Sequence, residues 1–175
     1  MKVKKTLSKA LLIICMVFLI TGCSSADISN IKRNGSAVQE YNKAIEIYNK
    51  LAISFSDLVR TMKKEAENPM AFDDKFWETY KEKEIKVLKN IDTMLGFQYK
   101  HKEIEKVKGS IDPLINDIKN YLNKIEDFRN KQHETDWNNF EKDSQLLYDE
   151  ILNRSAEITE VFNKIYDDYI ISKKN

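Results

Sequence analysis

Cysteine and histidine supply many of the nucleophiles and metal ligands of proteins, and this chain has two of each. The cysteines are Cys15 and Cys23, and the histidines are His101 and His133. Neither histidine has a glutamate three residues before it, so the Glu-x-x-His pairs of di-iron bundles are missing, as is a His-Glu-x-x-His zinc motif. Four scattered glycines cannot form a phosphate-binding loop. We therefore predict no metal site, no cofactor and no catalytic residue, and we expect that the protein is not an enzyme.

The residues before Cys23 have the layout of a signal peptide. Residues 1–9 carry four lysines and no acid, and residues 10–20 are apolar apart from the thiol of Cys15. This apolar run of 11 residues is too short to cross a hydrocarbon core about 30 Å thick, because a helix needs roughly 20 residues to do so. We therefore interpret residues 1–22 as a signal peptide that is removed.

The sequence Ile20-Thr21-Gly22-Cys23 resembles the lipobox of bacterial lipoprotein signals, which ends in cysteine. The resemblance implies export, cleavage before Cys23, and a diacylglycerol thioether on the Cys23 sulfur. Two acyl chains hold a protein stably at a membrane, since each buried CH₂ contributes about 0.8 kcal/mol. The expected location is therefore the extracytoplasmic face of the cell membrane. Abundant Lys, Asn and Ile, with only four arginines among 29 basic residues, suggest an AT-rich bacterium of the Gram-positive type.

Composition limits what the mature chain can do. Removing residues 1–22 takes away four lysines and no acids, so the formal charge changes from +1 to −3. Because no basic excess remains, we do not expect nucleic-acid binding. The mature chain has no thiol besides Cys23, so its stability must come from packing alone. Low glycine and proline contents, with many charged and aliphatic residues, favour long helices over sheets.

The chain is predicted to have three parts. Residues 1–22 form the signal peptide, residues 23–35 form the lipidated cysteine and a polar tether, and residues 36–172 form a helical domain. As a flexible coil the tether would span roughly 20 Å, which keeps the domain close to the membrane. Ser36-Ala37-Val38-Gln39 has the pattern of a capping box, so the first helix is expected to start there.

Apolar residues spaced three and four apart predict amphipathic helices along the whole domain. The first helix has about 30 residues and ends at Asn68-Pro69, because proline disfavours a helical residue before it. The second is capped by Asp73, with Phe72 and Trp77 as a hydrophobic staple, and ends near Gly96 unless that glycine lies within a longer helix. Its predicted apolar side consists of Trp77, Tyr80, Val87, Leu88, Ile91, Met94 and Leu95.

A third helix is predicted from about residue 100 to 131, because the apolar spacing continues over this range without a slip. The ring of Pro113 clashes with the carbonyl group of Gly109, and the missing side chain of Gly109 makes room for a bend. One kinked helix is therefore expected. The alternative is two helices that meet at Asp112-Pro113.

The last helix is expected to be capped by Thr135 or Asp136, with the small residues Ser144 and Ser155 at positions where another helix approaches closely. Its apolar stripe consists of Trp137, Phe140, Leu147, Ile151, Ile158, Phe162, Ile165 and Tyr169. Since each helix can bury its stripe only against the others, we predict an all-α fold, an elongated antiparallel bundle of about four long amphipathic helices. A dimeric coiled coil is the alternative.

With catalysis set aside, two classes of function remain. The first is a non-catalytic binding module at the cell envelope, which holds a protein or a cell-wall polymer. The second is a protective lipoprotein of the immunity or phage-exclusion type, which blocks an incoming protein. Small all-helical lipoproteins, including ones described as cell-wall-binding, are similar in layout. The residues expected to be exposed and to contact a partner are those that the stripes leave unassigned: Ile47, Ile53, Phe97 and Tyr99.

Overall fold

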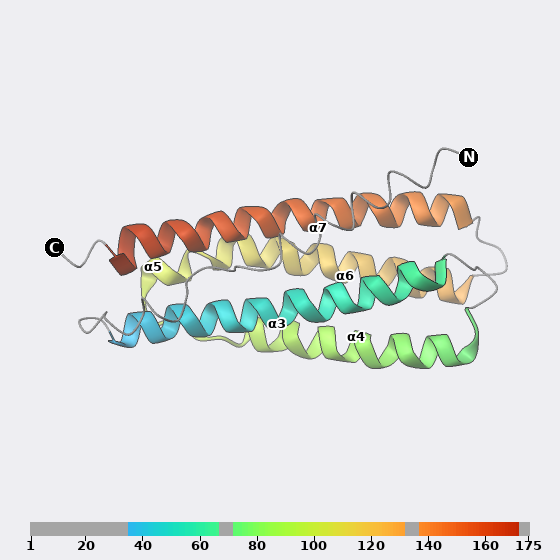
Figure 1. Cartoon of the computed structure of the whole chain (residues 1–175), viewed down its shortest axis with the longest axis horizontal. Coiled ribbons are helices and arrows are strands. Elements are labelled where there is room, and N and C mark those ends of the chain that lie inside the picture. Colours follow the sequence, from blue (N-terminus) through green and yellow to red (C-terminus); the bar gives the residue numbers. More distant parts are fainter. Residues whose placement is uncertain (1–34, 67–71, 132–136, 172–175) are drawn as a thin grey trace. The chain divides into compact units, whose positions relative to one another are not determined.

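The computed structural model describes residues 35–66, 72–131 and 137–171, and most of them are helical (Figure 1). The elements are α3 (Gly35–Ala66), α4 (Asp74–Leu95), α5 (Lys102–Glu105), α6 (Lys108–Asn130), α7 (Trp137–Ile165) and the π-helix η2 (Tyr166–Ile171). These residues contain no strand, so the all-α prediction is confirmed, and α3, α4, α6 and α7 are the long helices. Residues 1–34, which include Cys23, and the proposed caps Thr135 and Asp136 lie outside the described residues.

The described residues belong to two compact units. One is Tyr41–Tyr99, which contains most of α3 and all of α4. The other consists of the first residues of α3, up to Glu40, together with the chain from Lys100 onward. Each unit buries apolar side chains from its own helices.

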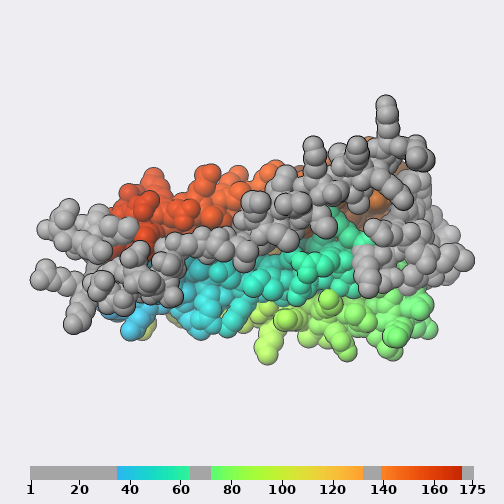
Figure 2. Space-filling view, in the orientation of Figure 1, coloured from blue at the N-terminus to red at the C-terminus, as the bar shows by residue number. Residues whose placement is uncertain are grey.

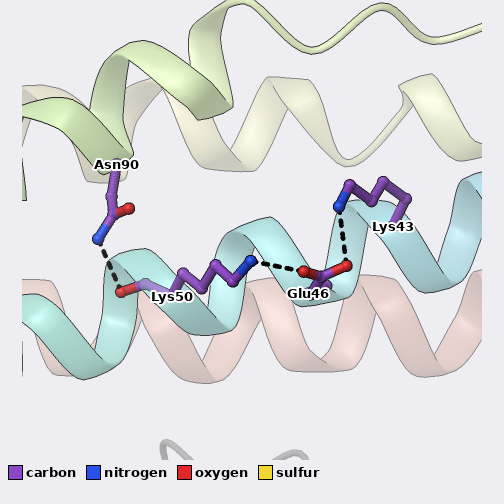
Figure 3. Close-up of polar contacts among 4 residues, drawn as sticks. All are labelled: Lys43, Glu46, Lys50 and Asn90. Atoms are coloured by element: carbon purple, nitrogen blue, oxygen red, sulfur yellow. Dashed lines mark hydrogen bonds and ion pairs between the residues drawn. The ribbon is translucent and has the colours of Figure 1, made fainter.

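In the Tyr41–Tyr99 unit, α3 and α4 are antiparallel. Asn90 on α4 donates a hydrogen bond of 3.1 Å to the backbone oxygen of Lys50 (Figure 3). It donates a second one, of 2.9 Å, to Ser54 Oγ. Lys83 lies nearer the start of α4, and its Nζ contacts the backbone oxygen of Asp57, which lies further along α3. Residue numbers thus rise on one helix as they fall on the other. Figure 2 shows the side chains of these two helices, in blue to green, packed directly against each other.

The start of α4 agrees with the sequence-based prediction. Asp73 is the N-cap, and its Oδ1 accepts a hydrogen bond of 2.8 Å from the backbone N–H of Phe76. The rings of Phe72 and Trp77 stack with their centroids 5.8 Å apart, which confirms the hydrophobic staple. The helix ends at Leu95, and the backbone N–H of Gly96 still bonds to Asp92 O at 2.9 Å.

The buried side of α4 differs from the prediction. Its buried residues are Phe76, Trp77, Tyr80, Glu84, Val87, Ile91 and Met94. Leu88 and Leu95, which were predicted to face the core, are exposed, whereas the charged Glu84 is buried. The prediction was wrong because it avoided Glu84, although positions 77, 80, 84, 87, 91 and 94 keep an unbroken helical spacing. Lys81 Nζ lies 2.7 Å from Glu84 Oε2 and compensates the buried charge.

In the second unit, the predicted single kinked helix is interrupted before Gly109. The short α5 ends at Glu105 and α6 begins at Lys108, so the break lies before Gly109 and not at Asp112-Pro113, and α6 runs through Pro113. Backbone hydrogen bonds between residues three apart, as in a 3₁₀ turn, mark the interruption. An example is the 3.0 Å bond from Ser110 N–H to Val107 O. The apolar phase nevertheless continues, since these residues are all buried: Ile104, Val107, Ile111, Leu114, Ile118, Tyr121, Ile125 and Phe128.

Helices α6 and α7 pack antiparallel in this unit. The rings of Phe128 and Phe140 stack with centroids 4.1 Å apart, and further from this end Asp117 pairs with Arg154. The buried side chains of α7 and η2 are Phe140, Ser144, Tyr148, Ile151, Ser155, Ile158, Phe162, Ile165 and Ile170. Tyr148 therefore takes the core position that was predicted for its neighbour Leu147. No helix in the described ranges has the length and apolar character needed to cross a membrane.

Candidate functional sites

The four residues predicted to contact a partner do not form one exposed patch. Ile53 is 50% exposed, as expected. Ile47 is only 4% exposed, so its predicted exposure is wrong. It belongs to a second buried row of α3, three residues after Ala44, and this row widens the buried face beyond the stripe assigned from the sequence. Phe97 and Tyr99 are partly buried and pack edge to face, with ring centroids 4.7 Å apart.

A different set of aliphatic residues is exposed on α4, and we call it the α4 row: Ile85, Leu88 and Leu95. Their exposed fractions are 57%, 38% and 45%. Together with Asp92 they follow a spacing of three, four and three residues, so they lie along one side of the helix. Most surface aliphatic residues of soluble proteins are scattered singly, and an aligned group of this kind is typical of an interaction surface.

The α4 row was not predicted from the sequence, although the signal for it was present. Leu88 and Leu95 were assigned to the core, and Ile85 was not assigned at all. The spacing of these three residues with Asp92 is itself a helical period, so α4 carries two neighbouring rows. Only the row that includes Glu84 is buried.

Exposed charges surround the α4 row. Lys81 lies on the same line one turn before Ile85, and Asp92 lies on it between Leu88 and Leu95. Glu82 and Lys89, also exposed, lie beside the row on its outer flank. Opposite charges therefore alternate along both lines of residues, which limits the partners that can lie against this side of α4.

His101 occupies the best-organised polar cluster of the second unit. Its Nδ1 lies 2.7 Å from Glu40 Oε2, and because a carboxylate can only accept, Nδ1 must carry the proton. Glu40 Oε1 also accepts hydrogen bonds from the backbone N–H groups of Lys100, at 3.0 Å, and His101, at 3.1 Å. The other ring nitrogen, Nε2, lies 3.5 Å from Ser36 Oγ, and the Tyr169 ring is 6.4 Å away between centroids.

The electrostatics of this cluster favour an ionised Glu40. The Glu40 side chain is only 8% exposed, and burial by itself raises the pKa of the carboxyl group. The hydrogen bonds from the His101 side chain and from the two backbone N–H groups act in the opposite direction and outweigh burial, so the net pKa lies below its usual value. A charged carboxylate therefore holds the chain before α5 against the first turns of α3.

The hydroxyl of Ser36, the imidazole of His101 and the carboxylate of Glu40 follow one another in space as the three groups of a catalytic triad do. The 3.5 Å between the hydroxyl and Nε2 is at the outer limit for a hydrogen bond, and Ser36 lies on the exposed first turn of α3. We interpret the cluster as a structural anchor. His101 is partly buried against Glu40, and His133 lies outside the described residues.

The exposed side of α3 carries a chain of ion pairs (Figure 3). Glu46 lies 2.5 Å from Lys50 Nζ and 2.9 Å from Lys43 Nζ. The hydrogen bond from Lys50 and then that from Lys43 lower the pKa of Glu46 to about 2. All three side chains are solvated, so this arrangement is an ordinary charged helix face in which residues three and four apart pair.

Metal binding and similarity to known proteins add no further site. Within residues 35–66, 72–131 and 137–171, no group of three histidine, cysteine, aspartate or glutamate side chains is placed to hold a metal ion. No protein-family model, curated protein or solved structure matches the chain.

Proposed function

We propose that the mature protein is a lipoprotein, anchored through Cys23 at the extracytoplasmic face of the cell membrane, that acts as a non-catalytic binding module of the cell envelope. Its partner in this proposal is a protein or a cell-wall polymer within reach of the tether. The anchor is supported by the basic start of the chain, the short apolar run and the lipobox that ends at Cys23.

The α4 row is the observation that carries the binding function. Fully burying an exposed leucine or isoleucine side chain contributes about 1.5–3 kcal/mol. The three side chains of the row are 38–57% exposed, so covering them would contribute roughly half of that amount for each. The unit that carries the row also exposes Ile53 on α3. The polar cluster around Glu40 and His101 holds two segments of the chain together, so we assign it a structural role. We therefore place the binding site for a partner on the α4 row.

The anchor is tested by intact-mass spectrometry of protein extracted from membranes. We expect the loss of residues 1–22 together with the added mass of a diacylglyceryl group on Cys23. A Cys23→Ala variant should be neither lipidated nor retained at the membrane. Normal processing and membrane retention of this variant would contradict the proposal.

Binding is tested by chemical crosslinking in intact cells. The wild type should capture partners that an Ile85→Ser, Leu95→Ser double variant captures much less, because both changes remove exposed apolar surface from the row without opening the core. Leu146→Ser is the matched control, since Leu146 is an equally exposed leucine on α7. Equal capture by all three proteins would show that the row is not the binding surface.

A further inference from the structure

The charge pattern around the α4 row fits one partner in particular. We propose that the α4 row of one molecule binds the α4 row of a second copy of this chain, with the two helices antiparallel and related by a two-fold axis. This inference rests on the proposed role of the row as a binding surface, and it names the partner.

The aliphatic residues define the register of the pair. In an antiparallel pair with two-fold symmetry, each contact occurs twice, because the same surface is used on both molecules. Placing Ile85 opposite Leu88 of the second copy also places Leu88 opposite Ile85 of the second copy. In that register Lys81 lies opposite Asp92 of the second copy, and Asp92 lies opposite Lys81 of the second copy. An apolar centre is thus enclosed by two pairs of opposite charges.

The flank of the row supports the same register. Glu82 and Lys89 lie on the outer side of the row, and in this arrangement Glu82 faces Lys89 of the second copy. Glu82 and Lys89 of the second copy are offset by two residues, or about 3 Å along the helix axis at a rise of 1.5 Å per residue. Their long side chains span that offset. The contact occurs twice by symmetry, so four opposite-charge pairs surround the apolar centre.

Lys81 can take part without giving up its contact inside the unit. Its Nζ lies 2.7 Å from Glu84 Oε2, and the lysine side chain remains about half exposed. An ammonium group has three donors, so it can hold the buried Glu84 and also face Asp92 of the second copy. The dimer would shield the ion pair between Lys81 and Glu84 from solvent and strengthen it.

Other arrangements of the same surface are disfavoured by charge. A parallel pair would place Lys81 against Lys81 and Asp92 against Asp92 of the second copy. Sliding the antiparallel helices by seven residues would pair Ile85 with Leu95 of the second copy but would place Leu88 against Asp92 of the second copy, near the centre of the contact. In the proposed register the carboxylate opposite Leu95 is Glu78 of the second copy, and this pair lies at the edge of the contact. An unrelated partner has no reason to match this charge order, whereas a second copy matches it by symmetry.

The first test places a photo-crosslinking amino acid at Ile85 in the full-length protein in intact cells. The proposal expects an adduct between two copies of the chain, with the crosslink mapped by mass spectrometry to the segment around Leu88. An adduct with a different protein would overturn the self-association and leave the binding function standing. The absence of any adduct would overturn both for this surface.

The second test reverses the flanking charges and measures self-association of the detergent-extracted protein by density-matched sedimentation equilibrium. Glu82→Lys and Lys89→Glu alone should each raise the dissociation constant of the dimer by about tenfold, because each creates two like-charge contacts per dimer. The double variant should restore the wild-type value.

Lys86→Glu is the control, because Lys86 is exposed on the same helix but points away from the row. It should leave the dimer unchanged. A monomeric wild type, or a double variant that is no better than the single ones, would overturn the antiparallel pair.

Discussion

Glu40 and His101 lie 61 residues apart in the sequence and are joined by a 2.7 Å contact between carboxylate and imidazole. The same carboxylate accepts two backbone hydrogen bonds from Lys100 and His101. These contacts fasten the chain before α5 to the start of α3. They connect two segments of one unit that the intervening residues Tyr41–Tyr99 separate in sequence.

The first prediction concerns acid stability. The pKa of Glu40 is lower in the folded protein than its ordinary value of 4.5, so the unfolded chain binds the proton more readily. The stabilisation by Glu40 is therefore complete above about pH 4.5 and is lost as the pH falls through the folded pKa. We expect Glu40→Gln to cost about 2 kcal/mol at pH 7, the usual contribution of hydrogen bonds to a charged group.

Denaturant unfolding at pH 7 and at pH 3 measures this effect. The difference in unfolding free energy between the wild type and Glu40→Gln should shrink at the lower pH, because Glu40 is then losing its charge. The exposed Glu78→Gln serves as the control and should change stability little at either pH. A difference that stayed the same at both pH values would contradict the role assigned to the carboxylate.

The second prediction concerns the centre of α6. Ile118 is almost completely buried, so Ile118→Asp places a charge without a partner in the core. We expect a loss of about 3–5 kcal/mol, which corresponds to a fall in melting temperature of roughly 10 °C. Lys119→Asp, at the exposed neighbouring position, should change the melting temperature by far less. Calorimetry or circular dichroism decides between these outcomes.

The third prediction concerns the close packing of α7. Ser155 is buried, and its hydroxyl donates a hydrogen bond of 2.8 Å to the backbone oxygen of Ile151 on the same helix. Ser155→Leu inserts volume into a packed seam and should cost about 1–3 kcal/mol. Ser155→Ala should be nearly neutral, since alanine has the same small size and a better helix propensity. Equal stability of both variants would show that the seam has spare room.

The fourth prediction concerns the N-cap of α4. Asp73→Ala removes the acceptor for Phe76 N–H and should destabilise the protein by about 1 kcal/mol. Asp73→Asn keeps an acceptor oxygen and should retain most of the stability. Asp74→Ala, one residue further on, affects only the helix dipole and should cost about 0.3–0.5 kcal/mol. Urea unfolding of the four proteins would reveal whether this order holds.

Local sequence signals predicted the features of this fold that depend on near neighbours. The cap at Asp73, the staple of Phe72 on Trp77 and the buried phase of α6 all involve residues that are three to five positions apart. Such interactions can be predicted from the sequence because both partners lie within one or two helical turns of each other. The interruption before Lys108 was missed because the apolar spacing continues through it. The spacing of apolar residues predicts which side of a helix is buried. It does not predict a tight turn that interrupts the helix without changing that spacing.

The sequence by itself determined that the chain is helical, where α4 begins and ends, and that each helix has an apolar side. Only the tertiary structure decided which of two adjacent rows of α4 is buried, so that Glu84 lies inside and Leu88 outside. It also decided that Ile47 is buried and that Glu40 meets His101. The physical reason is range. Helix formation is governed by neighbours within one or two turns, whereas the burial of a given row depends on side chains from helices that are distant in the sequence.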